Sequence, residues 1–150
     1  MMAEEKYGVM KGHIGDAPYN WTTGKTAGRL LQEFRDNRKF VGFKCPGCGK
    51  VYFPAKDICG ECYVPLEEEP VEVGPEGEVI SYTIVREANP ESPAEAPYVL
   101  GMVKLDGADT AVIGLLLAGD KDVQVGMRVK PEWKEERMGH FSDLEGFVSA

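Results

Sequence analysis

The residues best suited to chemistry in this 150-residue chain are its four cysteines. They form two identical C-x-x-C pairs, Cys45 with Cys48 and Cys59 with Cys62, and ten residues separate the pairs. In a C-x-x-C turn both sulfurs can bind the same ion, and two such turns complete a tetrahedron around zinc. We therefore predict a closed, structural zinc site made of four thiolates. Because a closed site leaves no open position for a substrate, none of these thiols is expected to act as a nucleophile.

Paired cysteines could also form two disulfides, a redox dithiol or an iron site. A disulfide framework is typical of secreted chains with signal peptides, and a thioredoxin-like redox motif needs one C-x-x-C in a βαβ context. Neither context is present in the sequence. Iron in a rubredoxin-type site stays open, because the Cys-Pro-x-Cys-Gly order is compatible with it, although a longer separation of the pairs is usual there. Zinc is the favoured ion.

Short elements must position these cysteines. Residues 40–44 and 50–54 enter and leave the first cysteine turn as β-strands, which makes this segment a zinc ribbon too small to fold without its metal. Four apolar residues ahead of it have the i, i+3, i+4, i+7 spacing of an amphipathic helix, namely Ala27, Leu30, Leu31 and Phe34. Residues 1–25 are rich in glycine and polar groups without clear periodicity, so we expect an irregular arm there.

After an acidic, proline-bounded connector at residues 64–70, the chain changes to short apolar runs. These runs are predicted strands at residues 79–85, 98–105, 111–117 and 127–130. Asp106-Gly107 is a hairpin signal, and residues 89–97 can only be a loop. About five strands within about 80 residues, with no long helix between them, are typical of a small closed barrel, and an OB-fold fits that size.

The predicted fold class is therefore mainly β, with an N-terminal helix and a rubredoxin-like zinc ribbon ahead of a small OB-fold barrel. We place the irregular arm at residues 1–25 and the helix with the ribbon at residues 26–66. The barrel with a C-terminal extension takes up residues 67–150. The proline-bounded connector marks the expected boundary between the two modules.

The net charge of −8 is unevenly distributed along the chain. Residues 1–66 carry ten Lys or Arg against seven Asp or Glu, a balance of +3, whereas residues 67–150 carry seven against eighteen, a balance of −11. Nucleic-acid affinity comes mainly from basic residues that release counterions, so the acidic half argues against a nucleic-acid partner. The first six residues lack an apolar signal stretch and no run approaches the length of a membrane span, so we expect a cytoplasmic protein without membrane contact.

Other polar residues form no catalytic pattern. His13 lies in the arm and His140 near the C-terminus, so each is expected to be a surface or packing residue. The acidic runs at residues 67–69 and 135–136 are expected to be solvated charges, because nothing nearby suggests desolvation. The triplet Gly24-Lys25-Thr26 is not a P-loop, because the glycine that this motif needs five positions earlier is absent. We therefore expect no catalytic residue in this chain.

Four segments carry a resemblance to a known family. They are FKCPGCGKVYFP at residues 43–54, GEVISYTIV at residues 77–85, PYVL at residues 97–100 and VGMRV at residues 125–129. In this order, after a helix and around a second cysteine pair, they resemble the acyl-CoA-associated proteins that join a rubredoxin-like zinc ribbon to a C-terminal OB-fold, long labelled a domain of unknown function. The resemblance covers residues 26–131, and the combination is far more specific than the cysteines alone. The arm departs from the family's minimal pattern.

The resemblance implies a small subunit that accompanies a thiolase-like enzyme. Some members bridge acetoacetyl-CoA thiolase and hydroxymethylglutaryl-CoA synthase in archaea. Others pair with thiolase-like proteins in the breakdown of steroid side chains or, in anaerobic toluene degradation, of benzoylsuccinyl-CoA, and a small separate subunit is most similar to this last type. We therefore expect a non-catalytic, zinc-binding accessory subunit in a hetero-oligomer. Its thiolase-like partner would hold the catalytic cysteine and share a CoA or acyl-CoA site with this chain.

Basic side chains near the predicted ribbon could approach the CoA phosphates, although no motif supports this role. They are Arg29, Arg35 and Arg38 on the predicted helix and Lys44, Lys50 and Lys56 in the ribbon. For the arginines a solvated helix face is the simpler interpretation. Two other functions stay open. One is a stand-alone acyl-CoA-binding OB-fold protein, and the other is a nucleic-acid-binding module, which the acidic charge disfavours.

Overall fold

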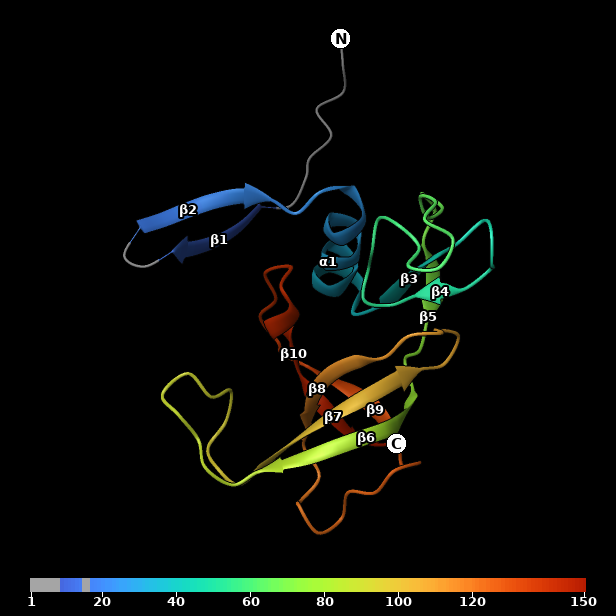
Figure 1. Ribbon diagram of the computed structural model, residues 1–150. Helices are drawn as coiled ribbons and strands as arrows, with labels where there is room; N and C mark the ends of the chain where they lie inside the picture. The colour runs from blue at the N-terminus through green and yellow to red at the C-terminus, as the bar shows by residue number, and fades with distance from the viewer. Residues whose placement is uncertain (1–8, 15–16) are drawn as a thin grey trace.

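The computed structural model describes residues 9–14 and 17–150, and in this part of the chain it confirms the mainly β fold class (Figure 1). The helix α1 (Lys25–Asn37) precedes the ribbon, and a 3-10 turn η1 (Phe141–Asp143) precedes the last strand. The strands are β1 (Val9–Ile14), β2 (Ala17–Thr22), β3 (Phe40–Lys44), β4 (Val51–Tyr52), β5 (Val71–Val73), β6 (Gly77–Val85), β7 (Tyr98–Leu105), β8 (Val112–Leu116), β9 (Arg128–Trp133) and β10 (Leu144–Ser149). Among the described residues, no helix combines the length and the apolar composition that crossing a lipid bilayer requires.

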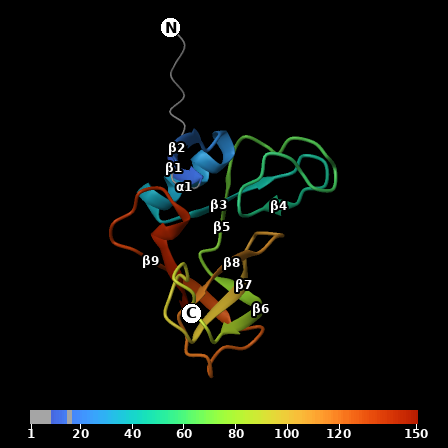
Figure 2. The same ribbon diagram turned by 60° about the vertical axis from the view of Figure 1, so that its left-hand side comes forward.

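The arm expected to be irregular contains a β-hairpin. Strands β1 and β2 pair antiparallel along their whole length, and the rings of Tyr19 and Trp21 stack with centroids 4.8 Å apart. Aromatic residues and threonine favour strands, whereas glycine disfavours them. The many glycines of this segment therefore obscured the strand pattern in the sequence. The hairpin lies beside the start of α1 and apart from the barrel in both views (Figures 1 and 2).

Helix α1 buries the face that the apolar spacing predicts. Leu30, Leu31 and Phe34 lie in the core. The arginines of the helix, Arg29 and Arg35, are exposed, as expected for a solvated face, and so is Arg38 directly after it. The helix ends at Asn37, because the next residue takes a left-handed backbone with φ of 55°. The helix therefore rests its apolar side on the rest of the protein and leaves its basic side open to water.

The ribbon is built on a three-stranded sheet with the order β4-β3-β5. Strands β3 and β4 pair antiparallel on either side of the first cysteine turn, with Phe43 opposite Tyr52. Strand β5 follows the acidic connector and pairs with the other edge of β3, with Phe40 opposite Val73. The ribbon sheet thus includes a strand from beyond the connector, and the chain runs from it directly into the barrel.

A closed barrel with the order β10-β8-β7-β6-β9 confirms the predicted OB-fold. Each of the four predicted apolar runs overlaps one of the strands β6 to β9. The hairpin signal before β8 is a turn in which Gly107 has φ of 84°, and the predicted loop at residues 89–97 connects β6 to β7. Strand β10 lies in what we expected to be a C-terminal extension. It closes the barrel by pairing antiparallel with β9 and parallel with β8.

One apolar core joins the helix, the ribbon and the barrel. It contains an aromatic group in which the ring of Phe40 lies 5.0 to 6.3 Å from four others, those of Phe34, Phe53, Trp133 and Phe147. The loop before β8 also bonds to the open edge of β4. The Asp109 carboxylate accepts from the N–H of Val51 at 2.8 Å, and the Thr110 hydroxyl donates to the carbonyl of Phe53 at 2.6 Å. The base of the ribbon is therefore part of the barrel's core.

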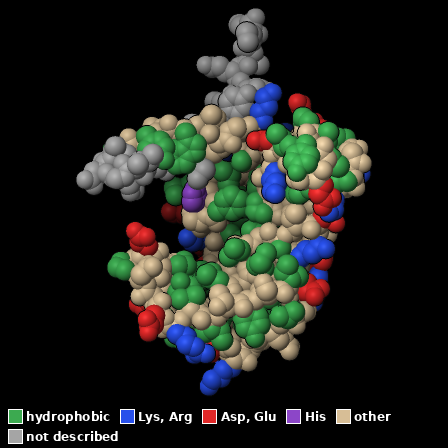
Figure 3. All heavy atoms as spheres, in the orientation of Figure 1, with side chains coloured by type: hydrophobic (Ala, Val, Ile, Leu, Met, Phe, Trp, Pro, Cys, Tyr) green, Lys and Arg blue, Asp and Glu red, His purple; other side chains and the backbone are tan. Residues whose placement is uncertain are grey.

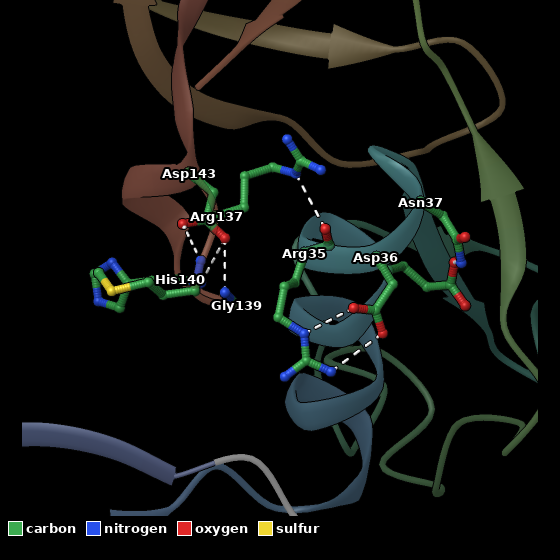
Figure 4. A network of polar contacts seen from close by, with 9 residues as sticks. Arg35, Asp36, Asn37, Arg137, Gly139, His140 and Asp143 are labelled. Atoms are coloured by element: carbon green, nitrogen blue, oxygen red, sulfur yellow. Dashed lines mark hydrogen bonds and ion pairs between the residues drawn. The ribbon is translucent and has the colours of Figure 1, made fainter. Parts of the chain in front are cut away.

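The loop between β9 and β10 is tied to α1. The carboxylate of Asp143 is 2% exposed and accepts hydrogen bonds from the N–H groups of residues 138–140 at 2.7 to 3.0 Å. From the same loop, the guanidinium of Arg137 donates to the carbonyl of Arg35 at 3.0 Å (Figure 4). A carboxylate that accepts several backbone hydrogen bonds holds its loop in one shape. The loop therefore holds the start of β10 against the helix.

Candidate metal centre

The four cysteines lie in two turns of the same design. In each turn the N–H of the first cysteine donates to a carbonyl five residues later, from Cys45 to Lys50 at 2.8 Å and from Cys59 to Val64 at 2.9 Å. The sulfur of that first cysteine accepts from two backbone N–H groups within the turn at 3.3 to 3.5 Å. Hydrogen bonds to sulfur favour the thiolate, which is the form that binds metals.

The two turns bring the four sulfur atoms within 4.8 Å of one another. Cys45 and Cys59 are buried, Cys62 is half-buried and Cys48 is exposed. The sulfurs of Cys48 and Cys59, one from each turn, are 3.8 Å apart. A tetrahedron with metal–sulfur bonds of about 2.3 Å has edges of about 3.8 Å. The four cysteines are therefore positioned to bind one metal ion, and a set of four soft sulfur donors suits zinc.

Tyr52 is a partner of this centre that the sequence did not reveal. It is 5% exposed, and its hydroxyl lies 3.2 Å from the sulfur of Cys59. This hydrogen bond, with those of the turn, lowers the pKa of Cys59 to about 6. Hydrogen bonding to Cys48 and burial raise the pKa of Cys62 to about 12. Cys59 therefore becomes a thiolate most readily, and the proton of Cys62 must leave when a metal binds.

We expect Tyr52→Phe to weaken zinc binding about tenfold, since partners that orient metal ligands typically contribute 10- to 100-fold. The change removes one hydroxyl and keeps the buried ring. Competition with a coloured chelator at pH 7 measures the affinity. Tyr63→Phe is the matched control, because Tyr63 directly follows Cys62 in the chain but its side chain is 82% exposed. Equal affinities for the two variants would show that the Tyr52 hydroxyl does not support the site.

The two cysteine turns differ at one equivalent position. The residue four places after the first cysteine is Gly49 in one turn and Tyr63 in the other, and both have a left-handed backbone, with φ of 76° and 56°. Glycine adopts this conformation readily, whereas other residues lose about 1–2 kcal/mol there. The second turn therefore holds an exposed tyrosine in a strained conformation.

This difference predicts opposite effects of two substitutions on the zinc-loaded protein. Tyr63→Gly should raise the free energy of unfolding by about 0.5–1 kcal/mol, after the greater flexibility of glycine in the unfolded chain is counted. Gly49→Ala should lower it by about 1 kcal/mol, because a Cβ atom there meets nothing closer than Lys44 Cε at 4.0 Å and only the backbone is strained. Denaturant unfolding measures both. A loss of stability in Tyr63→Gly would mean that the tyrosine ring makes a stabilising contact.

Three of the six basic residues considered for CoA phosphates already have partners. Lys50 forms an ion pair with Glu61 that links the two cysteine turns. The ammonium of Lys56 lies over the Tyr52 ring, 5.3 Å from its centroid. On the helix, the guanidinium of Arg35 donates to the Asp36 carboxylate at 2.7 and 3.1 Å (Figure 4). These contacts are on the surface, where ion pairs contribute little stability.

A cavity of about 520 Å³ lies between the start of α1 and the ribbon. The helix contributes Lys25 and Arg29 to its wall, and the connector contributes the acidic run at residues 67–69. The structure thus places the Gly24-Lys25-Thr26 triplet opposite the carboxylates of residues 67–69, which are exposed, as expected for solvated charges. Because both signs of charge face this space, its wall does not select for anions over cations.

The two histidines and the second acidic run are the remaining residues considered from the sequence. The ring nitrogen Nδ1 of His140 accepts from the N–H of Ser142 at 3.1 Å and so caps η1. His13 belongs to β1, and its side chain lies outside the described part of the structure. The acidic run at residues 135–136 is exposed. Asp143 was not singled out from the sequence. Its position three residues after His140, as in a capping box, was the available signal.

Comparison with known proteins gives matches to both parts of the chain. The family model described as the ChsH2 rubredoxin-like zinc ribbon domain matches residues 33–67, and the ChsH2 C-terminal OB-fold domain matches residues 70–134. A DUF35 domain-containing scaffold protein of Pyrococcus furiosus is 33% identical over 104 residues, which are 68% of this chain and 74% of that protein. A protein of the same description from Methanocaldococcus jannaschii is 28% identical over 102 residues, 68% of this chain and 72% of that protein.

Two solved structures share the fold. The Ltp2-ChsH2(DUF35) aldolase superimposes with a TM-score of 0.61 at 22% identity, covering 84% of this chain and 95% of that chain. A DUF35 protein of unknown function from Sulfolobus solfataricus superimposes with a TM-score of 0.62 at 22% identity, covering 83% and 85%. These similarities confirm the resemblance noted in the sequence. The chain belongs to the DUF35 family, whose ChsH2-type members join a rubredoxin-like zinc ribbon to a C-terminal OB-fold.

Proposed function

We propose that this chain is a non-catalytic accessory subunit that docks on a thiolase-like enzyme and helps to shape its acyl-CoA site. The observation that carries the proposal is the convergence of all four cysteines on one candidate metal centre. Thiolysis needs a cysteine nucleophile with a base that activates it. With its cysteines committed to a metal, this chain would depend on a partner for that thiol. Zinc at Cys45, Cys48, Cys59 and Cys62 would hold the ribbon in shape and touch no substrate.

The names of related proteins support an accessory role. The relatives from Pyrococcus furiosus and Methanocaldococcus jannaschii are described as scaffold proteins. One similar structure is named as an aldolase of ChsH2(DUF35) together with a second protein, Ltp2. A scaffold needs rigid surfaces more than reactive groups, and the shared core of helix, ribbon and barrel provides such surfaces.

The thiolase-like partner and the substrate class rest on the family resemblance described above. We propose a β-ketoacyl-CoA ester as the substrate of the complex, and benzoylsuccinyl-CoA of anaerobic toluene degradation as the first compound to test. The complex would be a cytoplasmic hetero-oligomer. Because substrate selectivity would lie mostly in the partner, the acyl group has to be identified with the complex and not with this chain alone.

The cavity beside α1 favours one alternative, a stand-alone acyl-CoA-binding protein. Its volume of about 520 Å³ is within the usual range of ligand pockets. The mixed charge of its wall, with Lys25 and Arg29 facing residues 67–69, weighs against this alternative. An acyl-CoA carries several phosphate charges, which the carboxylates would repel.

Co-expression with the thiolase-like protein encoded nearest to this chain tests the proposal. The two chains should elute together in size exclusion, contain zinc in proportion to this chain, and cleave a β-ketoacyl-CoA only when both are present. Elution of this chain alone, with measurable binding of acyl-CoA, would support the alternative. Thiolysis by the partner at full rate without this chain would contradict the accessory role.

A further inference from the structure

The outer side of the barrel carries apolar side chains where a solvated surface is expected. Strand residues alternate between the core and the outside. On β7 and β8 the inward residues already fill the core, with Val99, Val103 and Leu116 at most 4% exposed. The outward residues between them are apolar as well. We call them the outer apolar face, namely Ile80, Leu100, Met102, Ile113, Leu115 and Leu117.

Strand pairing makes the outer apolar face continuous. Leu100 lies opposite Leu115, and Met102 lies opposite Ile113. On the other side of β7, Met102 pairs with Ser81, and Ile80 lies in the bulge beside that pair. Residues directly opposite on one face of a sheet have Cβ atoms about 4.5–5.5 Å apart. The side chains therefore form one surface across three strands and not scattered single residues.

The exposure of this face is high for apolar side chains. Ile113 is 67% exposed, Leu117 44%, Ile80 42% and Met102 39%. Figure 3 shows hydrophobic side chains gathered over this side of the barrel, with few charged groups between them. Contiguous apolar patches on a protein surface mark interaction sites. Since the core is already closed on the inner side of these strands, folding of this chain does not explain the outer face.

A small apolar cavity of about 110 Å³ adjoins the face where β8 meets β10. Ile113 and Leu115 line it together with Phe141 and Leu144. Strand β8 pairs with β10 only at Leu116 and Phe147, so the first half of β8 lies open on this side. An apolar side chain of a docked protein could enter this cavity, as anchors do at the centre of interfaces.

Acidic groups border the outer apolar face. The loop that leaves β6 and returns to β7 carries exposed Glu87, Glu91 and Glu95 against one basic residue, Arg86. At the same end of the sheet, two acids follow Leu117 with one lysine between them, and Glu145 lines the small cavity. Two copies packed face to face would each present this acidic half of the chain, which carries seven basic against eighteen acidic residues, and like charges across an interface are unfavourable. The border suits a partner with the opposite charge.

We infer that the outer apolar face is the surface on which the catalytic partner docks, and that the partner presents an apolar centre bordered by Lys and Arg. This inference rests on the proposed function, since it assigns the docking surface of that complex. The apolar centre supplies affinity, while the acidic border steers association and orients the two chains.

Two matched substitutions test the assignment in the full, zinc-loaded chain. Ile113→Glu places a charge at the centre of the face. Met138→Glu, at a side chain 80% exposed in the loop between β9 and β10 that lies against α1, adds the same charge outside the face. Binding to the thiolase-like protein encoded nearest to this chain is measured by surface plasmon resonance. We expect at least about 30-fold weaker binding for Ile113→Glu, the loss typical of a central anchor, and less than about threefold for Met138→Glu, as for contacts outside the centre.

Two further variants distinguish failure of the docking face from failure of the proposed function. Met102→Glu should weaken binding in the same way, and the double variant Glu91→Lys, Glu95→Lys should slow association and reduce its dependence on salt. Wild-type binding that Ile113→Glu and Met102→Glu leave unchanged would overturn the docking face and leave the proposed function standing. Absence of wild-type binding would contradict the proposed function itself. A change in the mass of this chain alone on Ile113→Glu, without loss of partner binding, would assign the face to a second copy and overturn the inference.

Discussion

Removal of the metal is expected to unfold the outer part of the ribbon and leave the barrel folded. The outer part has its own small core of five buried residues, two of which are cysteines of the metal centre. They are Phe43, Cys45, Tyr52, Cys59 and Leu66. Without the ion these cysteines lose their shared ligand, and three remaining side chains cannot offset the entropy of ordering about twenty residues. Structural zinc contributes on the order of 10 kcal/mol or more to folding of such units.

Hydrogen exchange with and without a strong chelator measures this effect. We expect protection to be lost at residues 44–50 and 55–66 and retained at the base of the ribbon and in β6, β7 and β8, because that base packs in the core of the barrel. Addition of zinc to the chelated protein should restore the lost protection and serves as the control. Retained protection at residues 44–50 and 55–66 would show that the metal is not structural. Loss of protection throughout the barrel would show that the ribbon cannot unfold separately.

Elements defined by local pattern could be predicted, and elements defined by distant pairing could not. Helix α1 has a full apolar stripe, and the strands of the barrel up to β9 are apolar runs bounded by turn residues. Strand β10 has only Leu144, Phe147 and Val148 around a glycine, so its sequence is too short a signal. It is a strand because β9 and β8 both pair with it. The hairpin of β1 and β2 was missed for a similar reason, since glycines interrupt its alternation.

The same distinction between local pattern and distant pairing applies to the candidate metal centre. The spacing of the cysteines predicts one shared site, because the chemistry of a C-x-x-C turn is local. The contact of Tyr52 with Cys59 depends on how the two cysteine turns fold over β3 and β4, which no local pattern contains. The outer apolar face needed the strand register as well. In the sequence, Met102 and Ile113 belong to two runs that could equally have faced the core.

A second large effect is expected at Phe40, where the helix, the ribbon and the barrel meet. Its side chain is 2% exposed, and its ring contacts four other rings that come from α1, the base of the ribbon, β9 and β10. Replacing a buried phenylalanine with alanine typically costs about 3–5 kcal/mol, because burial is lost and a cavity is left. This loss is a large part of the total stability of a small domain, which is about 5–15 kcal/mol.

Phe40→Ala should therefore lower the free energy of unfolding by about 3–5 kcal/mol, and the far-ultraviolet signal of the helix and the near-ultraviolet signal of Trp133 should be lost in one shared transition. Phe141→Ala is the matched control, because that ring is 41% exposed and contacts the aromatic group only through Phe34. We expect it to cost less than about 1 kcal/mol. Phe40→Ala could instead unfold in two separate transitions, with the Trp133 signal lost at the wild-type midpoint. That result would mean that the stability of the barrel does not depend on the packing around Phe40. A single shared transition would show that the ribbon base and the barrel fold as one unit, which a rigid docking subunit requires.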